Sequence, residues 1–150
     1  MSRPYNGCDQ GINLQIPKIF RELGLTVLPL DFLPLDQVNI LQDWPNMYWR
    51  YGRRILAAAE IIRQDPRLFS VYITNFGCGP DSFITKFFNK KMSGKPYLQM
   101  EIDEHSADAG AITRCEAFAD SLENLDKDIM PKKPKVKQIH MNDRKRLLYI

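Results

Sequence analysis

Helical and extended patterns alternate along the first 124 residues, and this alternation limits the possible folds more than any other feature. Four stretches carry apolar residues at helical spacing: 17–23, 45–64, 80–93 and 107–122. Three short apolar runs between them are predicted as strands: 25–30, 68–74 and 97–102. A regular exchange of helices and strands favours a parallel sheet covered by helices on both faces.

The helical spacing also predicts which side chains face the core. In the stretch opened by Pro45, the expected inward positions are Tyr48, Tyr51, Ile55, Ala58 and Ile62. In the first helix they are Ile19, Phe20 and Leu23, with Gly24 ending the helix. In the last helix they are Ile112, Cys115, Ala119 and Leu122.

The predicted fold class is α/β: a small, doubly wound, mainly parallel sheet with helices on both faces, in a Rossmann-like three-layer arrangement. The series of elements begins with a helix, whereas a doubly wound unit normally begins with a strand. We therefore expect the chain to be a fragment of a larger protein that lacks its first strand, before Arg3. The expected division is an α/β domain over residues 1–124 and a basic tail or linker over 125–150.

Charge is distributed unevenly between these two parts. The chain of 150 residues is 44% hydrophobic and carries a formal net charge of +3. Residues 125–150 hold eight Lys or Arg against three Asp, so the remainder is slightly acidic. A basic run can contact nucleic acid or anionic lipid, but its Pro and Lys content favours a solvated linker. The apolar end, Leu147-Leu148-Tyr149-Ile150, either packs on the body, starts an element that continues beyond it, or dangles.

Several protein classes do not fit this sequence. There is no run of about 18 apolar residues and no apolar stretch typical of a secretory signal at the N-terminus. Three widely spaced cysteines do not form a disulfide framework, so a reducing cytoplasm is the expected compartment. Neither G-x-x-x-x-G-K-[ST] nor G-x-G-x-x-G occurs, so we expect no ATPase activity in this segment.

Ligands of parallel α/β sheets bind beyond the carboxyl ends of the strands. Three loops are expected at that edge: 5–9, 75–81 and 101–106. Cys78 lies in the second loop between Gly77 and Gly79, immediately before a predicted helix that starts at Pro80. Backbone N–H groups at a helix start favour a thiolate, which binds metals and attacks electrophiles. The alternative is that Cys78 is only a small residue in a tight turn.

The other two cysteines are expected to differ from Cys78. Cys8 lies in the first loop, and its role is left open, whereas Cys115 falls on the apolar stripe of its helix and is expected to be buried. An iron–sulfur cluster normally needs four ligands, usually cysteines. A cluster at Cys78 therefore needs ligands from another domain or subunit, and a zinc site is not indicated because no C-x-x-C pair occurs.

The third loop is acidic and offers candidates for acid–base or hard-cation chemistry. The candidate catalytic residues are Glu101, Asp103, Glu104 and His105. Strand alternation places Glu101 and Asp103 on one face. The competing interpretation is structural: Asp103 or Ser106 caps the last helix and His105 forms hydrogen bonds within a turn.

Several motifs together resemble one family, the large bacterial CoA-substrate-specific enzyme activase-like proteins, in their region related to (R)-2-hydroxyacyl-CoA dehydratase subunits. The resemblance covers roughly residues 3–123 and is most specific in its two longest motifs, 74–83 and 101–110. Shorter motifs support it: Arg3-Pro4-Tyr5-Asn6, Gly11-Ile12-Asn13 with Ile16-Pro17, residues 28–34 and residues 47–52.

The resemblance implies an iron–sulfur, electron-transfer function for the longer protein. In the family, an activase domain uses ATP to pass an electron to a cluster held by cysteines of a dehydratase-like α/β domain. Carried over, it implies that residues 1–124 are dehydratase-like, that Cys78 is a cluster ligand flanked by Gly77 and Gly79, and that residues 101–110 lie near the same site. The implied partners are other domains or subunits and an acyl-CoA substrate.

The activase domain itself is absent from the sequence, so we expect this segment alone to be inactive and without a cofactor. A membrane or nucleic-acid partner is not expected. Two other interpretations stay open: a cofactor-free binding or assembly module with Trp44, Tyr48 and Trp49 as interface anchors, and a thiol enzyme that uses Cys78 with His105.

Overall fold

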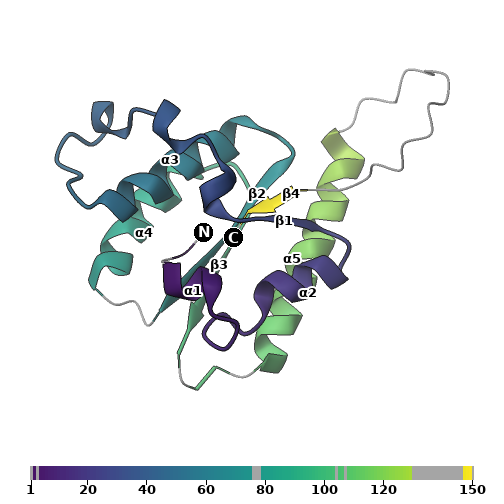
Figure 1. Cartoon of the computed structure of the whole chain (residues 1–150). Helices are drawn as coiled ribbons and strands as arrows, with labels where there is room; N and C mark the ends of the chain where they lie inside the picture. Colours follow the sequence, from purple (N-terminus) through teal and green to yellow (C-terminus); the bar gives the residue numbers. More distant parts are fainter. Residues whose placement is uncertain are drawn as a thin grey trace.

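The computed structural model describes residues 2, 4–75, 79–103, 105–106, 108–129 and 147–149. Its centre is a parallel sheet of four strands in the order β1-β4-β2-β3 (Figure 1). The strands are β1 (Thr26–Leu28), β2 (Leu68–Asn75), β3 (Tyr97–Ile102) and β4 (Leu147–Tyr149). The predicted mixed α/β class with a parallel sheet is therefore confirmed.

Strand β2 explains why both faces of the sheet are covered, because its side chains are apolar on both sides. Leu68 and Tyr72 belong to one core cluster, and Phe69, Val71 and Ile73 belong to the other. Successive side chains of a strand point to opposite faces, so the alternation divides β2 between the two clusters. A strand that is buried on both faces is typical of a parallel sheet between two helical layers.

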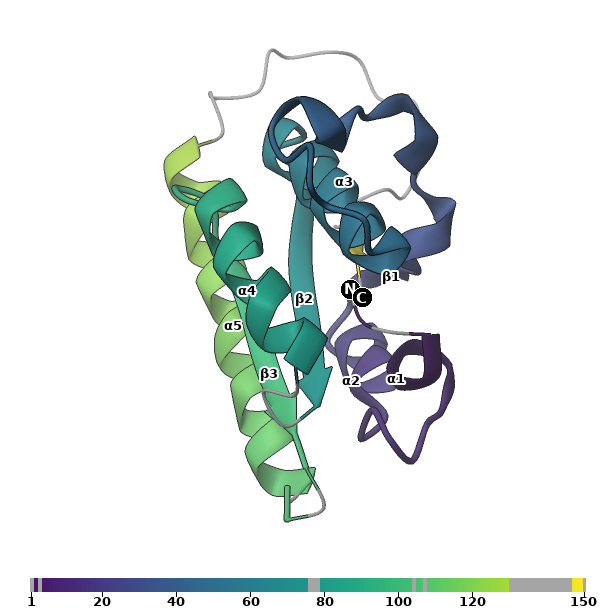
Figure 2. The ribbon, with the colours of Figure 1, turned by 90° about the vertical axis from the view of Figure 1, so that its left-hand side faces the viewer.

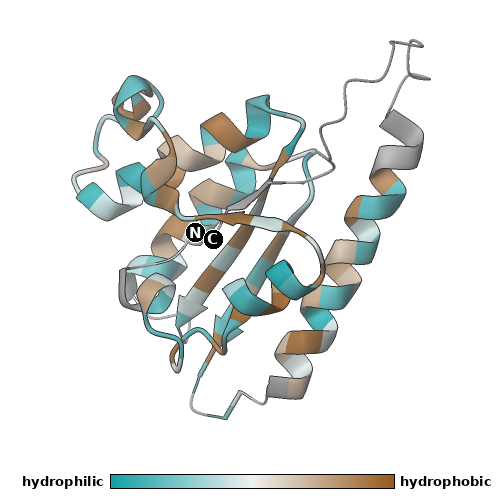
Figure 3. Ribbon diagram, turned by 45° about the vertical axis from the view of Figure 1, so that its right-hand side comes forward, coloured by the Kyte–Doolittle hydropathy of each residue, from teal (hydrophilic) through white to brown (hydrophobic). Residues whose placement is uncertain are grey.

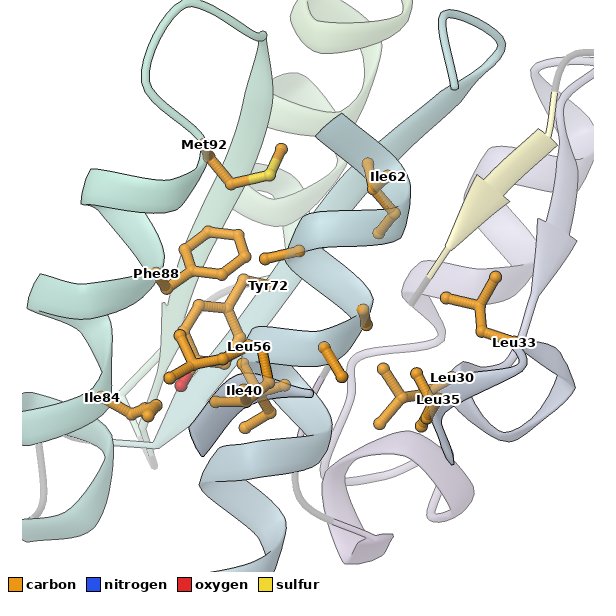
Figure 4. Packing of buried hydrophobic residues seen from close by; sticks show 14 of the residues in the cluster. Leu30, Leu33, Leu35, Ile40, Leu56, Ile62, Tyr72, Ile84, Phe88 and Met92 are labelled. Atoms are coloured by element: carbon orange, nitrogen blue, oxygen red, sulfur yellow. The ribbon is translucent and has the colours of Figure 1, made fainter. Parts of the chain in front are cut away.

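Helices α3 (Arg50–Gln64) and α4 (Gly79–Lys91) pack on the Tyr72 side of the sheet. Figure 4 shows Phe88 of α4 beside the ring of Tyr72, with Met92, the residue that follows α4, on the other side of Phe88. The ring centroids of Tyr72 and Phe88 are 4.9 Å apart, and both residues are fully buried. Apolar burial of this kind is the main stabilising contribution to a layered fold.

Helices α2 (Ile16–Glu22) and α5 (Asp108–Ile129) cover the opposite face. Phe20 of α2 meets Phe118 of α5 edge-to-face, with ring centroids 6.4 Å apart. Gly24 follows α2 with a φ of 81°, a left-handed conformation that residues with a Cβ rarely adopt, so its predicted role in ending the helix is confirmed. Figure 3 shows apolar and hydrophilic residues interleaved along α5, as expected for a helix with one buried face.

The predicted start of the longest central helix was wrong. α3 begins at Arg50 and not at Pro45, because residues 45–49 form turns that bury Met47. Tyr48, expected in the core, is 81% exposed for the same reason. The other predicted inward positions of α3, from Tyr51 to Ile62, are partly or fully buried.

Two further core predictions were wrong at the ends of the helices on the other face. Leu23 is 38% exposed and Ile112 is 40% exposed. The buried stripe of α5 instead consists of Ala111, Cys115, Phe118, Ala119 and Leu122. α5 also runs beyond the predicted end at residue 122, as far as Ile129.

The segment before β1 and the segment after it contain short helices. α1 (Pro4–Cys8) forms where a loop was expected, and three 3-10 turns follow β1: Leu30–Phe32, Leu35–Gln37 and Ile40–Gln42. Figure 2 shows α1 and α2 at the level where β2 ends. α1 and α2 therefore lie beside the carboxyl end of β2, at the edge where a ligand site is expected.

The C-terminal strand β4 lies between β1 and β2. Leu147 pairs with Thr26 on one side and with Leu68 on the other. Three alternatives were open for the apolar end of the chain. The structure supports packing on the body, because β4 pairs with two strands of the sheet. The strand expected before Arg3 falls outside the described residues and stays a prediction.

Candidate functional site

The carboxyl ends of β2 and β3 lie side by side. Asn75, the last residue of β2, is paired in register with Ile102, the last residue of β3. Two of the three predicted loops, 75–81 and 101–106, therefore leave the sheet at the same edge. β4 and β1 end earlier, because Tyr149 pairs with Ser70 and with Leu28.

The first predicted loop meets the second through two asparagine side chains. The Nδ2 of Asn6, in α1, donates a hydrogen bond of 2.5 Å to the Oδ1 of Asn75. Asn6 is fully buried and Asn75 is half-buried, so this bond is partly shielded from solvent. An amide pair without charge gives little sequence signal, and this is why Asn6 and Asn75 were not among the predicted site residues.

Cys78 and Gly77, the principal predicted ligand and its neighbour, lie outside the described residues. Both ends of their segment are described: Asn75 closes β2 and Gly79 opens α4 with a φ of 27°. Asp81, in the first turn of α4, is only 2% exposed, where a carboxylate suits the helix dipole. The segment that holds Cys78 is thus attached at both ends to the carboxyl edge.

The acidic loop is organised by Asp103. The Oδ1 of Asp103 accepts hydrogen bonds from the backbone N–H of His105, at 2.9 Å, and from the hydroxyl of Ser106, at 2.8 Å. These bonds, with that of Ser106 first, lower the pKa of Asp103 below its ordinary value. They support a structural role for Asp103 in a turn that precedes α5.

The other acidic candidates have different positions. Glu101 is an exposed residue of β3, His105 is exposed in the turn, and Glu104 lies outside the described residues. Glu101 and His105 therefore face solvent at the carboxyl edge, where each is accessible to a substrate.

Cys115 is the buried residue that its sequence position predicted. It is fully buried among the residues of α5, with its Sγ 4.0 Å from the Sδ of Met100. Burial raises the pKa of its thiol to about 11, so it stays protonated near neutral pH. Cys115 is therefore excluded as a metal ligand in this folded state.

Cys8, in contrast, is exposed at the end of α1 and lines a cleft of about 330 Å³. The cleft lies beyond the carboxyl end of β1, between α1, the start of α2 and the start of α3. Its lining combines polar side chains, two cations, one carboxylate and an apolar wall: Ser2, Gly7, Cys8, Gln10, Asn13, Gln15, Pro17, Lys18, Arg21, Val27, Pro29, Leu30, Asp31 and Tyr51.

A charged group lies on the α3 side of this cleft. Arg54 forms an ion pair with Asp31, which lines the cleft. Burial raises the pKa of the nearby Tyr51 phenol, and the charge of Asp31 raises it further. Sequence reasoning missed this group because its members belong to different elements that only the fold brings together.

The described residues do not form a complete metal site: no group of three or more His, Cys, Asp or Glu side chains among them lies close enough to hold an ion. Of the two described cysteines, Cys115 is buried in the core and Cys8 is exposed, while the predicted ligand Cys78 lies outside the described residues. No helix in the described part of the chain is long and apolar enough to cross a membrane.

No protein-family model, curated protein or solved structure matches the chain.

Proposed function

We propose that this chain is a dehydratase-like module of a bacterial iron–sulfur protein related to the CoA-substrate-specific enzyme activases, with Cys78 as one cluster ligand. The observation that carries the proposal is the contact between Asn6 and Asn75, at 2.5 Å. It joins two of the motifs on which the family resemblance rests, and the register of Asn75 with Ile102 adds the third at the same edge. Motifs far apart in the sequence would gather in this way around one site.

The proposal also includes a more specific fold class. We infer a small doubly wound, Rossmann-like sheet in three layers. Two separate core clusters on the two faces of β2 support it, as does the parallel direction of all described strand pairs. In such sheets the carboxyl edge is the expected ligand site.

The cluster itself requires more than this chain. Cys78 supplies one thiolate, with Gly77 and Gly79 leaving room for close approach, and the remaining ligands come from other domains or subunits. When bound, an iron–sulfur cluster supplies one-electron chemistry at a potential tuned by its surroundings. The exposed Glu101 and His105 stay the candidates for proton transfer to an acyl-CoA substrate, and Glu104 joins them from outside the described residues.

A reducing bacterial cytoplasm is the compartment that suits this proposal. Cys8 and Cys115 are free thiols in the structure, and such thiols persist where glutathione or thioredoxin keeps cysteines reduced.

A cofactor-free docking module is the second candidate, and exposed aromatic side chains favour it. Tyr48 is 81% exposed and Phe83 is 57% exposed, whereas Trp44 and Trp49 pack against the core. Exposed aromatic residues are typical anchors of protein interfaces.

Anaerobic iron and sulfide analysis of the native gene product that carries these 150 residues separates the two candidates. The proposal expects a coloured protein that loses its visible absorption band in Cys78→Ser but keeps it in the control Cys115→Ala. Cys8→Ser tests whether the exposed thiol is a second ligand. A colourless protein after anaerobic iron–sulfur reconstitution would support the docking module instead.

A further inference from the structure

Neither Asn75 nor Gly79, the described residues on either side of Cys78, lines the cleft beside Cys8, and the chemistry of this cleft points to a ligand of its own. It lies at the carboxyl end of β1, at the edge where open parallel sheets bind ligands. Its volume of about 330 Å³ is near the lower limit of about 300–1,000 Å³ for small-molecule sites. A ligand enclosed here is therefore compact.

The charge of the cleft is positive. Lys18 and Arg21, both from α2, line it, and the single carboxylate of the lining, Asp31, is neutralised by Arg54. Arg21 has no ion-pair partner among the described residues. Lys18 donates a hydrogen bond of 3.4 Å to the Oε1 of Gln15 and lies 3.9 Å from Glu22. The side chains of Lys18 and Glu22 are both more than half exposed, and such exposed pairs contribute little. Two cations are thus available for an anion.

The back wall of the cleft holds a polar group that is not satisfied by the described part of the protein. Asn13 is 2% exposed, and its Nδ2 donates to the carbonyl of Gly7 at 3.4 Å. Its Oδ1 is buried without a hydrogen-bond partner among the described residues. Buried polar atoms are normally paired, and an amide oxygen accepts hydrogen bonds, so Asn13 calls for a donor, such as a water molecule or a hydroxyl group of the ligand, and not for the oxyanion itself.

We propose that this cleft binds a small molecule that carries a carboxylate or phosphate group, held by Arg21 and Lys18. Arginine recognises both oxyanions through paired N–H donors, and lysine adds a second positive charge. Tyr51 and Gln15, also in the lining, supply neutral hydrogen bonds, while Pro29 and Leu30 provide the apolar wall.

The position of Cys8 in the same lining gives a direct readout. A bound anion shields the Cys8 thiol, so it slows alkylation by N-ethylmaleimide, which peptide mass spectrometry follows at each cysteine separately. Inorganic phosphate and malonate are the two probes, and they distinguish the phosphate source from the carboxylate source. The buried Cys115 serves as the internal reference within the same chain.

We expect saturable protection of Cys8 by at least one probe, weakened about tenfold or more in affinity by Arg21→Ala and by Lys18→Ala. Loss of one charge-assisted hydrogen bond is of this size. The matched control is Lys90→Ala, which removes an exposed cation of α4 that does not line the cleft. Protection by neither probe, protection that does not saturate, or an equal loss in Lys90→Ala would overturn the proposal. Because no arm depends on Cys78 or on iron, failure here leaves the proposed cluster function untouched.

Discussion

Lys91, at the end of α4, forms ion pairs with α3 and with the loop before it. These ion pairs predict how stability depends on pH. The Nζ of Lys91 lies 2.6 Å from an oxygen of Glu60 in α3 and 2.6 Å from one of Asp43. The hydrogen bond from Lys91 is the largest of the effects that lower the pKa of Glu60 from 4.5 to about 2. Burial alone would lower the pKa of Lys91, but these two bonds outweigh it and raise that pKa.

Acid should therefore destabilise the fold in a defined window. The folded pKa of Glu60 is below the unfolded one, so its contribution is complete above about pH 4.5 and is lost as the pH falls towards 2. Urea unfolding across this range should show a smaller loss of free energy in Glu60→Gln than in the wild type. Glu22→Gln, which removes a largely exposed carboxylate, is the control and should retain the wild-type slope. An unchanged acid dependence in Glu60→Gln would contradict the assigned role.

Position 52 requires glycine because the neighbouring side chains leave no room for a Cβ atom. A Cβ at this position would lie 2.7 Å from Cε3 of Trp49 and 3.1 Å from Cδ1 of Ile84. Gly52→Ala should therefore destabilise the protein by about 1–3 kcal/mol through overpacking, measured by denaturant unfolding. Gly110→Ala in α5 is the matched control: nothing lies within 4 Å of the added Cβ, so it should be neutral or stabilising. Equal stability of the two variants would refute this explanation.

Two phenylalanines of α4 differ in burial, so we expect their substitution to affect stability by different amounts. Phe88 is fully buried against Tyr72 and Tyr97, whereas Phe83 is 57% exposed. Phe88→Ala should cost about 3–5 kcal/mol of unfolding free energy because it leaves a cavity. Phe83→Ala should cost less than about 1 kcal/mol, because most of its ring already contacts water. A thermal-unfolding comparison of the two variants checks this, and a similar loss in both would mean that the packing of α4 is wrongly described.

At the scale of elements, local patterns placed the starts of α2, α4 and α5 within one residue but misplaced the start of α3. β3 spans residues 97–102, the predicted range, because its apolar run is bounded by Gly94 and by Asp103. Pro45 gave a false start for α3, since a proline at a helix start is also a common turn residue. Met47 is buried in the folded protein, which favours turns over a helix before Arg50. This burial depends on tertiary contacts, so no local pattern predicts it.

At the scale of the whole molecule, the position of β4 depends on pairing with β1 and β2, which lie far from it in the sequence. Its register places Leu148 opposite Val27 and Phe69. Deleting residues 147–150 should therefore leave β1 and β2 without their shared neighbour, lower the thermal-unfolding midpoint and speed amide hydrogen exchange in β1. Deleting residues 138–141, within the tail, is the control. Unchanged exchange in β1 after removal of 147–150 would contradict the described sheet order.

The sheet edge of the candidate site was predicted from strand direction, whereas the predicted ligand Cys78 lies outside the described residues. Parallel strands place their carboxyl ends at one edge, so the ends of β2 and β3 were expected together and are found together. The Asn6–Asn75 bond and the group of Tyr51, Asp31 and Arg54 were missed, because uncharged amides and separated charges become a site only after folding. In the acidic loop, the hydrogen bonds of Asp103 favour the structural alternative, in which this carboxylate organises its own turn.

The central claim, that Cys78 holds iron at the carboxyl edge, is tested most directly by anomalous X-ray scattering at the iron edge. Crystals of the anaerobically prepared native gene product are needed, with Cys78→Ser crystals as the comparison. We predict an iron peak bonded to the Sγ of Cys78, near the end of β2, that disappears in Cys78→Ser. Iron bonded elsewhere, or no iron in a protein that crystallises folded, would contradict the claim.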